Sequence, residues 1–206
     1  MEAEAETKND FKLFDLYSLE DVEVKDKALE PYINLKPKIL VKTQGADHKA
    51  KFVGMRMNIV ERLANRVAVP GHIGKKHKII TSWSSGKYYS NVKTILKALQ
   101  AIEKKTNKNP IQVLVDAVVM CSPRDEVTII EHAGARYPQA VDVSPMRRVN
   151  LAIRWIVQGA YTKAFGKKKK MYETLANEII LASEGNMESY AMTKKNDSEK
   201  QADSAR

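Results

Sequence analysis

The segment from residue 109 to residue 121 constrains the fold more than any other part of this sequence. Asn109 and Pro110 form a helix-start signal, because Asn is a favoured N-cap and Pro fits the first helical turn. In the following stretch, residues 111–120, all side chains except Gln112 and Asp116 are apolar. A helix that is apolar nearly all round must be surrounded by other elements. The sequence therefore predicts a helical bundle with this segment at its centre.

Four further segments place apolar residues at helical spacing: 55–67, 91–105, 144–165 and 171–184. Each has a polar face opposite the apolar one, as expected of helices that cover a central helix. Cys121, at the end of the central segment, is expected to be a packed thiol rather than a nucleophile. Its neighbours are mostly apolar, and a reactive thiolate needs basic surroundings.

Residues 126–131 and 139–143 have the composition of strands and are separated by a short loop. They predict a two-stranded hairpin arm over residues 126–143. A hairpin alone is marginally stable in water, and Pro138 removes one ladder donor. We therefore expect the arm to need a partner along its length, either RNA or another protein.

The predicted fold is mainly α: a helical bundle with a protruding two-stranded β-hairpin arm and an irregular acidic N-terminal extension. We expect the extension to cover residues 1–37, the helical domain residues 38–188 and a polar, poorly ordered C-terminal tail residues 189–206. The first ten residues or so look disordered, whereas residues 11–35 carry too many apolar side chains for a free tail, so we expect this segment to pack on something. Residues 68–90, rich in Gly and Lys, are expected to form an exposed basic loop.

The charge of the chain is unevenly distributed. The 206 residues include 35 Lys and Arg against 25 Asp and Glu, for a net charge of +10. Residues 1–35 hold ten acids and four bases, so the rest of the chain holds fifteen acids and thirty-one bases. Such a basic body is typical of a protein that binds a polyanion. A well-solvated surface remains the alternative explanation.

The candidate polyanion-binding residues are basic side chains on the predicted helices, loops, arm and tail. They are Lys49, Lys51, Arg56, Lys75, Lys76, Lys78, Arg124, Arg136, Arg147, Arg148, Arg154, Lys167, Lys168, Lys169, Lys170, Lys194 and Lys195. Arginine can hold a phosphate with two parallel hydrogen bonds, whereas lysine acts as a point charge. We expect those of the arm, of the helix over 144–165 and of the two lysine-rich loops to converge on one face.

Several other classes of protein fit the sequence poorly. It contains no P-loop, no dinucleotide-binding glycine motif and no nucleophile elbow, so we expect no enzyme and no cofactor. The single cysteine and four scattered histidines predict no metal site. The acidic start and the lack of a long apolar run predict a soluble, intracellular protein with no membrane contact. A basic helical DNA-binding protein and a protein adaptor that uses residues 11–35 remain open alternatives.

Three stretches of the sequence resemble a known family. Residues 109–115 (NPIQVLV), 122–126 (SPRDE) and 139–150 (QAVDVSPMRRVN) are similar to the signature of small-subunit ribosomal protein seven, called protein five in eukaryotes. Two supporting stretches, residues 58–63 before these and 175–180 after them, complete the order typical of that family. The sequence over 141–145 resembles the eukaryotic and archaeal branch of the family. The chain as a whole resembles a divergent eukaryotic member.

The resemblance implies a function that the composition and spacing alone do not. A member of this family binds the three-prime major domain of small-subunit ribosomal RNA and promotes assembly of the subunit head. The resemblance further implies neighbouring head proteins and small-subunit protein eleven as partners, with the hairpin near exit-site tRNA and mRNA. The expected location is the cytoplasm, in ribosomes.

Overall fold

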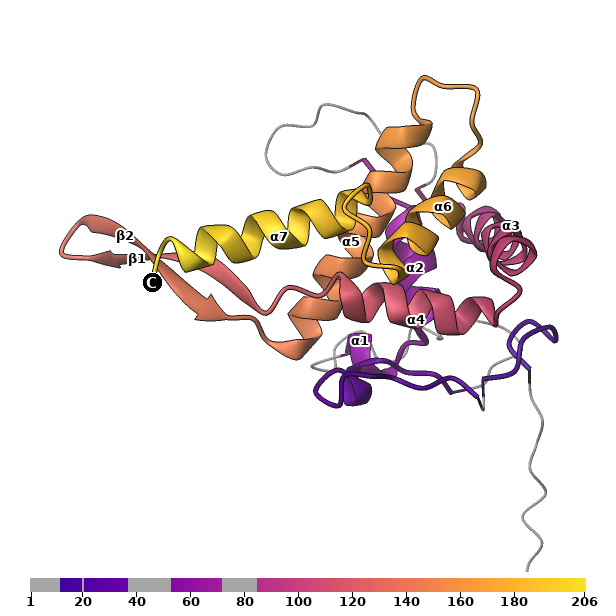
Figure 1. Ribbon diagram of the computed structural model, residues 1–206, viewed down its shortest axis with the longest axis horizontal. Coiled ribbons are helices and arrows are strands. Elements are labelled where there is room, and N and C mark those ends of the chain that lie inside the picture. The colour runs from indigo at the N-terminus through magenta and orange to yellow at the C-terminus, as the bar shows by residue number, and fades with distance from the viewer. Residues whose placement is uncertain (1–11, 20, 37–52, 72–84) are drawn as a thin grey trace, which may run out of the picture.

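The computed structural model describes residues 12–19, 21–36, 53–71 and 85–206. In chain order its elements are η1 (Glu30–Tyr32), α1 (Val53–Arg56), α2 (Ile59–Val67), α3 (Tyr88–Thr106), α4 (Pro110–Met120), β1 (Asp125–His132), β2 (Ala135–Asp142), α5 (Pro145–Ala164), α6 (Met171–Ser183) and α7 (Tyr190–Asp203). Figure 1 shows the helices gathered in a bundle from which the hairpin projects to one side. The predicted fold class is confirmed.

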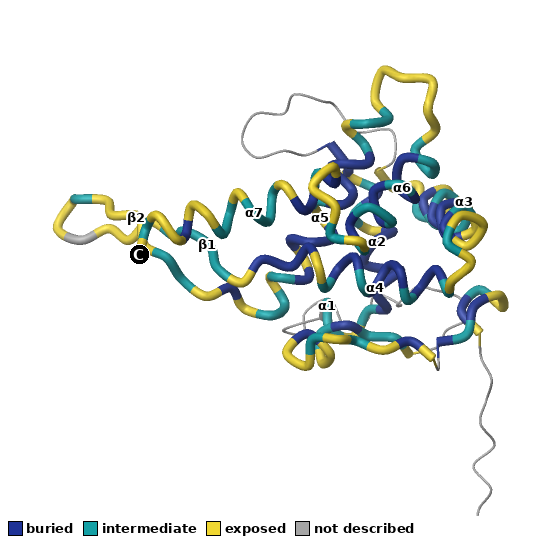
Figure 2. Tube along the Cα trace, in the orientation of Figure 1, coloured by how far each residue is buried: buried dark blue, intermediate teal, exposed yellow. Residues whose placement is uncertain are grey.

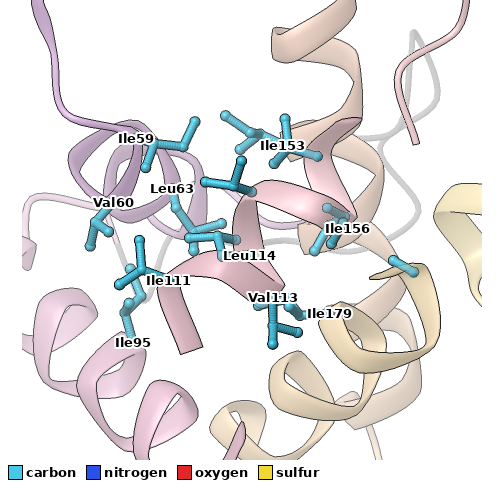
Figure 3. Close-up of a cluster of buried hydrophobic side chains, with 14 of the residues drawn as sticks. Ile59, Val60, Leu63, Ile95, Ile111, Val113, Leu114, Ile153, Ile156 and Ile179 are labelled. Atoms are coloured by element: carbon cyan, nitrogen blue, oxygen red, sulfur yellow. The ribbon is translucent and has the colours of Figure 1, made fainter. Parts of the chain in front are cut away.

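Helix α4 lies at the centre of the bundle, as its sequence predicts. The side-chain oxygen of Asn109 accepts a hydrogen bond from the backbone amide of Ile111 at 3.0 Å, which caps the helix. Ile111 and Leu114 are almost fully buried, and α3, α5 and α6 all contact α4. Figure 3 shows these two side chains among apolar side chains of α2, α3, α5 and α6. The core thus joins helices that are far apart in the sequence.

The segment expected to be one helix over 55–67 is instead two helices, α1 and α2. The side-chain oxygen of Asn58 accepts from the backbone amide of Val60 at 2.9 Å, so Asn58 caps a new helix. Its side-chain nitrogen donates to the carbonyl oxygen of Lys36 at 3.1 Å. The prediction of one helix is wrong because Asn favours an N-cap over a helix interior. Helix α3 also begins earlier than expected, at Tyr88, within the predicted loop.

The N-terminal extension lies along the bundle and is irregular apart from η1 (Figure 1). Leu13 and Leu29 are fully buried against the core. The Tyr17 hydroxyl donates to a carboxylate oxygen of Glu103 in α3 at 3.2 Å. For the described residues, the prediction that segment 11–35 packs rather than forming a free tail is confirmed, and the surface it packs on is the helical bundle. The extreme N-terminus, which we expect to be disordered, lies outside the described residues.

Strands β1 and β2 form an antiparallel hairpin whose register runs from Asp125 opposite Asp142 to His132 opposite Ala135. A hairpin is therefore confirmed, and it covers residues 125–142, beginning and ending one residue before the predicted bounds of 126–143. A two-residue turn joins the strands, and both its residues have positive φ. This is the twist that short hairpins favour. Figure 2 shows the distal part of the arm exposed on its surface, in contrast to the buried bundle.

Residues 189–206, expected to be a poorly ordered tail, instead carry helix α7. The Ser189 hydroxyl oxygen caps it by accepting from the backbone amide of Met192 at 3.4 Å. Ala191 and Ala202 are fully buried, and α7 contacts α5 and β1. The expectation of disorder is wrong because a few buried alanines and tertiary contacts stabilise a helix whose own sequence is mostly polar. Figure 1 shows α7 alongside the base of the arm.

Candidate nucleic-acid interface

Arginines lie exposed on α5 and at the base of the arm. The Arg147 guanidinium nitrogen Nε lies 2.6 Å from a carboxylate oxygen of Glu126 in β1. Arg154 is exposed two turns further along α5. Arg124, just before β1, has an exposed side chain, and its backbone amide donates to Glu199 of α7 at 3.0 Å. These contacts fix the side chain of Arg147 and the backbone of Arg124, while all three arginines remain exposed to solvent.

Arg148, the neighbour of Arg147, is held by the N-terminal extension. Its Nη2 lies 3.0 Å from Oδ2 of Asp26, and its side chain is 12% exposed. Its Nε is buried and has no hydrogen-bond partner among the described residues. That Arg148 binds RNA stays a prediction, and such binding requires the contact with Asp26 to open.

The four lysines from Lys167 to Lys170 form the turn between α5 and α6. All four are exposed, and none makes an ion pair with a described residue. Helix α5 has 20 residues, which corresponds to a length of about 30 Å. The turn therefore lies at the opposite end of α5 from Arg147 (Figure 1). The candidate cations of α5 and of the turn that follows it therefore do not form one compact cluster but lie at both ends of the helix and between them.

The two predicted lysines of α7 have partners within the chain. Lys195 donates from Nζ to the carbonyl oxygen of Met120 at 2.9 Å, at the C-terminal end of α4. Lys194 lies 3.3 Å from a carboxylate oxygen of Asp197 and 5.8 Å from the ring centroid of Tyr190. Both lysines therefore contribute to the packing or surface pairing of α7.

The remaining candidates lie at the tip of the arm, in α1 or outside the described residues. Arg136 is exposed, and its Nε lies 3.4 Å from a carboxylate oxygen of Glu131. Arg56 is exposed in the last turn of α1. The candidates outside the described residues are Lys49, Lys51, Lys75, Lys76 and Lys78.

A second basic surface lies between α3 and the start of α6, and of its lysines only Lys170 was among the predicted binding residues. Lys93, Lys97, Lys104 and Lys170 line a groove of about 530 Å³ together with Tyr172. Among the described residues that line it there is no carboxylate. The signal was present in the sequence, because lysines four and seven residues apart share one face of a helix.

The chemistry of the described residues gives no sign of catalysis. Cys121 is fully buried, and burial raises the pKa of its thiol to about 12. The expected packed thiol is confirmed. Within the described ranges, no group of three or more His, Cys, Asp or Glu side chains could hold a metal ion. No helix in this part of the chain is long and apolar enough to cross a membrane.

Comparison with known proteins agrees with this arrangement. The family model of ribosomal protein S7p/S5e matches residues 29–206. The chain belongs to this family. It is 46% identical to the small ribosomal subunit protein uS7 of Nanoarchaeum equitans over 195 residues. The matched region covers 95% of this chain and 98% of the relative. The uS7 proteins of Archaeoglobus fulgidus and Methanothermobacter thermautotrophicus are each 40% identical, over 200 and 193 residues. These cover 97% and 94% of this chain, and 97% and 98% of the relatives.

Family membership confirms the resemblance that the signature residues indicated. It also confirms that the chain is a structural ribosomal protein rather than an enzyme. The three relatives are archaeal. That the chain is a divergent eukaryotic member stays a prediction.

Proposed function

We propose that this S7p/S5e-family protein binds the three-prime major domain of small-subunit ribosomal RNA. The observation that carries the proposal is the turn from Lys167 to Lys170, where four consecutive exposed lysines have no ion pair with a described residue. Folded RNA presents dense phosphates and hides its major groove, so proteins read it through shape and backbone contacts. The exposed arginines of α5 extend this basic surface toward the arm.

In this proposal the protein promotes assembly of the subunit head, and its arm lies near exit-site tRNA and mRNA. The exposed apolar side chains of the arm support a role in docking. Ile129 is 67% exposed and Tyr137 is 59% exposed. Exposed apolar side chains on the arm of a basic protein suit contact with other ribosomal components, including neighbouring head proteins and small-subunit protein eleven. The protein would then act in cytoplasmic ribosomes.

The first experiment is sucrose-gradient sedimentation of cell lysate at physiological salt, with each fraction probed for this chain. We expect the protein to migrate with small subunits and whole ribosomes. A pool that sediments slowly or is associated with DNA and contains most of the protein would contradict the proposal. That outcome would favour the alternative of a basic helical DNA-binding protein.

A second experiment measures binding to a three-prime major-domain RNA fragment over a range of salt concentrations. Replacing Lys167 to Lys170 by Gln should reduce the slope of log K against log salt by about 0.7 to 0.9 for each phosphate that the variant no longer neutralises. The control variant, Lys12→Gln with Lys108→Gln, removes exposed lysines elsewhere and should leave the slope nearly unchanged. An unchanged slope in the four-residue variant would remove this turn from the interface.

A further inference from the structure

A groove of about 390 Å³ between α2 and α5 is lined by cationic and amide side chains together with the apolar residues Met57, Met146 and Ile153. Three arginines, Arg62, Arg66 and Arg154, line it together with Asn65 and Asn150. No carboxylate is among the described residues that line it. Concave sites lined by cations and amide groups are suited to anions.

A hydrogen bond between the side chains of Arg62 and Asn150 joins α2 to α5 at this groove. Arg62 is buried and donates from Nη2 to the side-chain oxygen of Asn150 at 2.8 Å. It also donates from Nη1 to the carbonyl oxygen of Tyr32 in the extension at 2.7 Å. Arg62 is therefore a structural residue whose charge is already hydrogen-bonded within the protein.

One helical turn further along, Arg66 has no such partners. Arg66 follows Arg62 by four residues on α2, Arg154 follows Asn150 by four on α5, and both arginines line the same groove. Nε and Nη2 of Arg66 are buried, yet neither has a hydrogen-bond partner among the described residues. Burial, and secondly the charge of Arg154, lowers the pKa of Arg66. The two guanidinium groups thus lie close enough to repel each other.

An anion would relieve both unfavourable features. Buried donors without partners are rare in folded proteins because each one costs the free energy of its hydration. Nε and Nη2 form one straight edge of the guanidinium group, and once the side chain turns this edge into the groove it can donate two parallel hydrogen bonds to two oxygens of one phosphate. The negative charge would also offset the repulsion between Arg66 and Arg154.

We propose that Arg66 and Arg154 together hold one backbone phosphate of RNA in the groove between α2 and α5. The identity of this ligand rests on the proposed RNA-binding function. The site adds Arg66 to the residues proposed to bind RNA. Arg66 was not among the predicted binding residues, although it lies four residues after Arg62 on the polar face of its helix. The structure places it opposite Arg154.

The site is tested first without RNA, using inorganic phosphate as the probe. The full-length protein is titrated with phosphate in chloride buffer at constant ionic strength, and the arginine Nε–H signals are followed by NMR. We expect the Arg66 signal, identified by its absence in Arg66→Gln, to shift and saturate. Saturation should disappear in Arg154→Gln and persist in Lys108→Gln, a control that loses the same charge at an exposed position away from the groove. A small, unsaturated shift shared by all exposed arginines would overturn the proposal.

Thermal stability gives a second readout that a structural role for Arg66 would not reproduce. In chloride buffer, Arg66→Gln should have a Tm equal to or above that of the wild type, because it removes a buried charge without partners. The variant should also lack the rise in Tm that phosphate gives the wild type. A large fall in Tm in chloride would show that Arg66 already has stabilising partners and would overturn the proposal.

Binding to the three-prime major-domain RNA fragment separates this inference from the proposed function. Arg66→Gln and Arg154→Gln should each bind roughly tenfold more weakly than the wild type. The double variant should be weakened by less than the product of the two effects, because both residues bind one phosphate. If the wild type fails to bind at physiological salt, the proposed function fails. If the wild type binds and Arg66→Gln binds equally well, the phosphate site fails while the function stands.

Discussion

Nζ of Lys163 lies 2.6 Å from Oε2 of Glu178, a carboxylate that is completely buried. The other carboxylate oxygen of Glu178 accepts from the Ser189 hydroxyl at 2.8 Å and from the backbone amide of Ala191 at 3.2 Å. One side chain of α6 thus joins the C-terminal part of α5 to the first turn of α7. A negative charge near a helix N-terminus is favourable, so the carboxylate also stabilises the start of α7.

The first prediction is that Glu178→Gln lowers the free energy of unfolding by about 1 to 3 kcal/mol. All three partners of the carboxylate are donors, so the new NH₂ group of Gln must face at least one of them. Urea or guanidinium unfolding followed by circular dichroism measures the change. Glu184→Gln, an exposed position at the end of α6, is the control and should change stability by less than about 0.5 kcal/mol. Equal stability of both variants would show that the buried charge contributes nothing net.

The second prediction concerns Cys121 and pH. Burial raises the pKa of its thiol from 9.0 to about 12, so between these values the native chain keeps a proton that the unfolded chain has released. The free energy of unfolding should therefore fall as pH rises from about 9 toward 12. Comparing the pH slope of the wild type with that of Cys121→Ala isolates this contribution from the titration of lysine and tyrosine.

Chemical modification gives an independent check on Cys121. At pH 8 the native thiol should react with an aromatic disulfide reagent at least about 100-fold more slowly than the same thiol in guanidinium, because it is buried and protonated. Fast, stoichiometric reaction in the native protein would contradict the assignment as a packed thiol. In the unfolding experiment, a pH slope of the free energy of unfolding that is identical in the wild type and in Cys121→Ala would contradict the raised pKa.

The third prediction is that α7 fixes the base of the arm. Nη2 of Arg206 lies 2.6 Å from a carboxylate oxygen of Asp125, and Glu199 accepts from the backbone amide of Arg124 at 3.0 Å. A hairpin is marginal without support. Replacing both Glu199 and Arg206 by Ala should speed amide hydrogen exchange in β1 by roughly three- to tenfold. Lys200→Ala, exposed on α7, is the control. Unchanged exchange in the double variant would mean that the hairpin is fixed by its own pairing.

The sequence predicts those elements whose signals are local. The cap at Asn109 and the apolar run after it identify α4, and alternating residues on either side of a short turn identify the hairpin. Family identity is also visible, because its signature lies in contiguous stretches of sequence. Local signals fail where burial depends on a distant segment. Gln158 follows the exposed Arg154 by four residues, on the same side of the helix over 144–165, yet it is buried.

The candidate site shows the same limit. The sequence places Arg62 on the polar side of its helix, but the extension and α5 cover that side and bury it. The lysine turn at 167–170 is exposed as its composition predicts. The helix α7 was missed because its stability comes from α5 and β1 rather than from its own polar sequence. Tertiary contacts decide which arginines have partners within the protein, and the spacing of residues in the sequence does not predict those contacts.

The last prediction concerns the ion pair between Asp26 and Arg148, which lie 122 residues apart in the sequence. Asp26→Asn should free the Arg148 guanidinium, so the RNA fragment should bind about two- to fivefold more tightly, with a steeper salt slope. Because Asn can keep the hydrogen bond that Asp26 accepts from the backbone amide of Ala28, unfolding stability should fall by only about 0.5 to 1.5 kcal/mol. Asp21→Asn, exposed in the same extension, makes the same change in net charge. Equal gains in affinity from both variants would attribute the effect to net charge and would contradict a specific hold on Arg148.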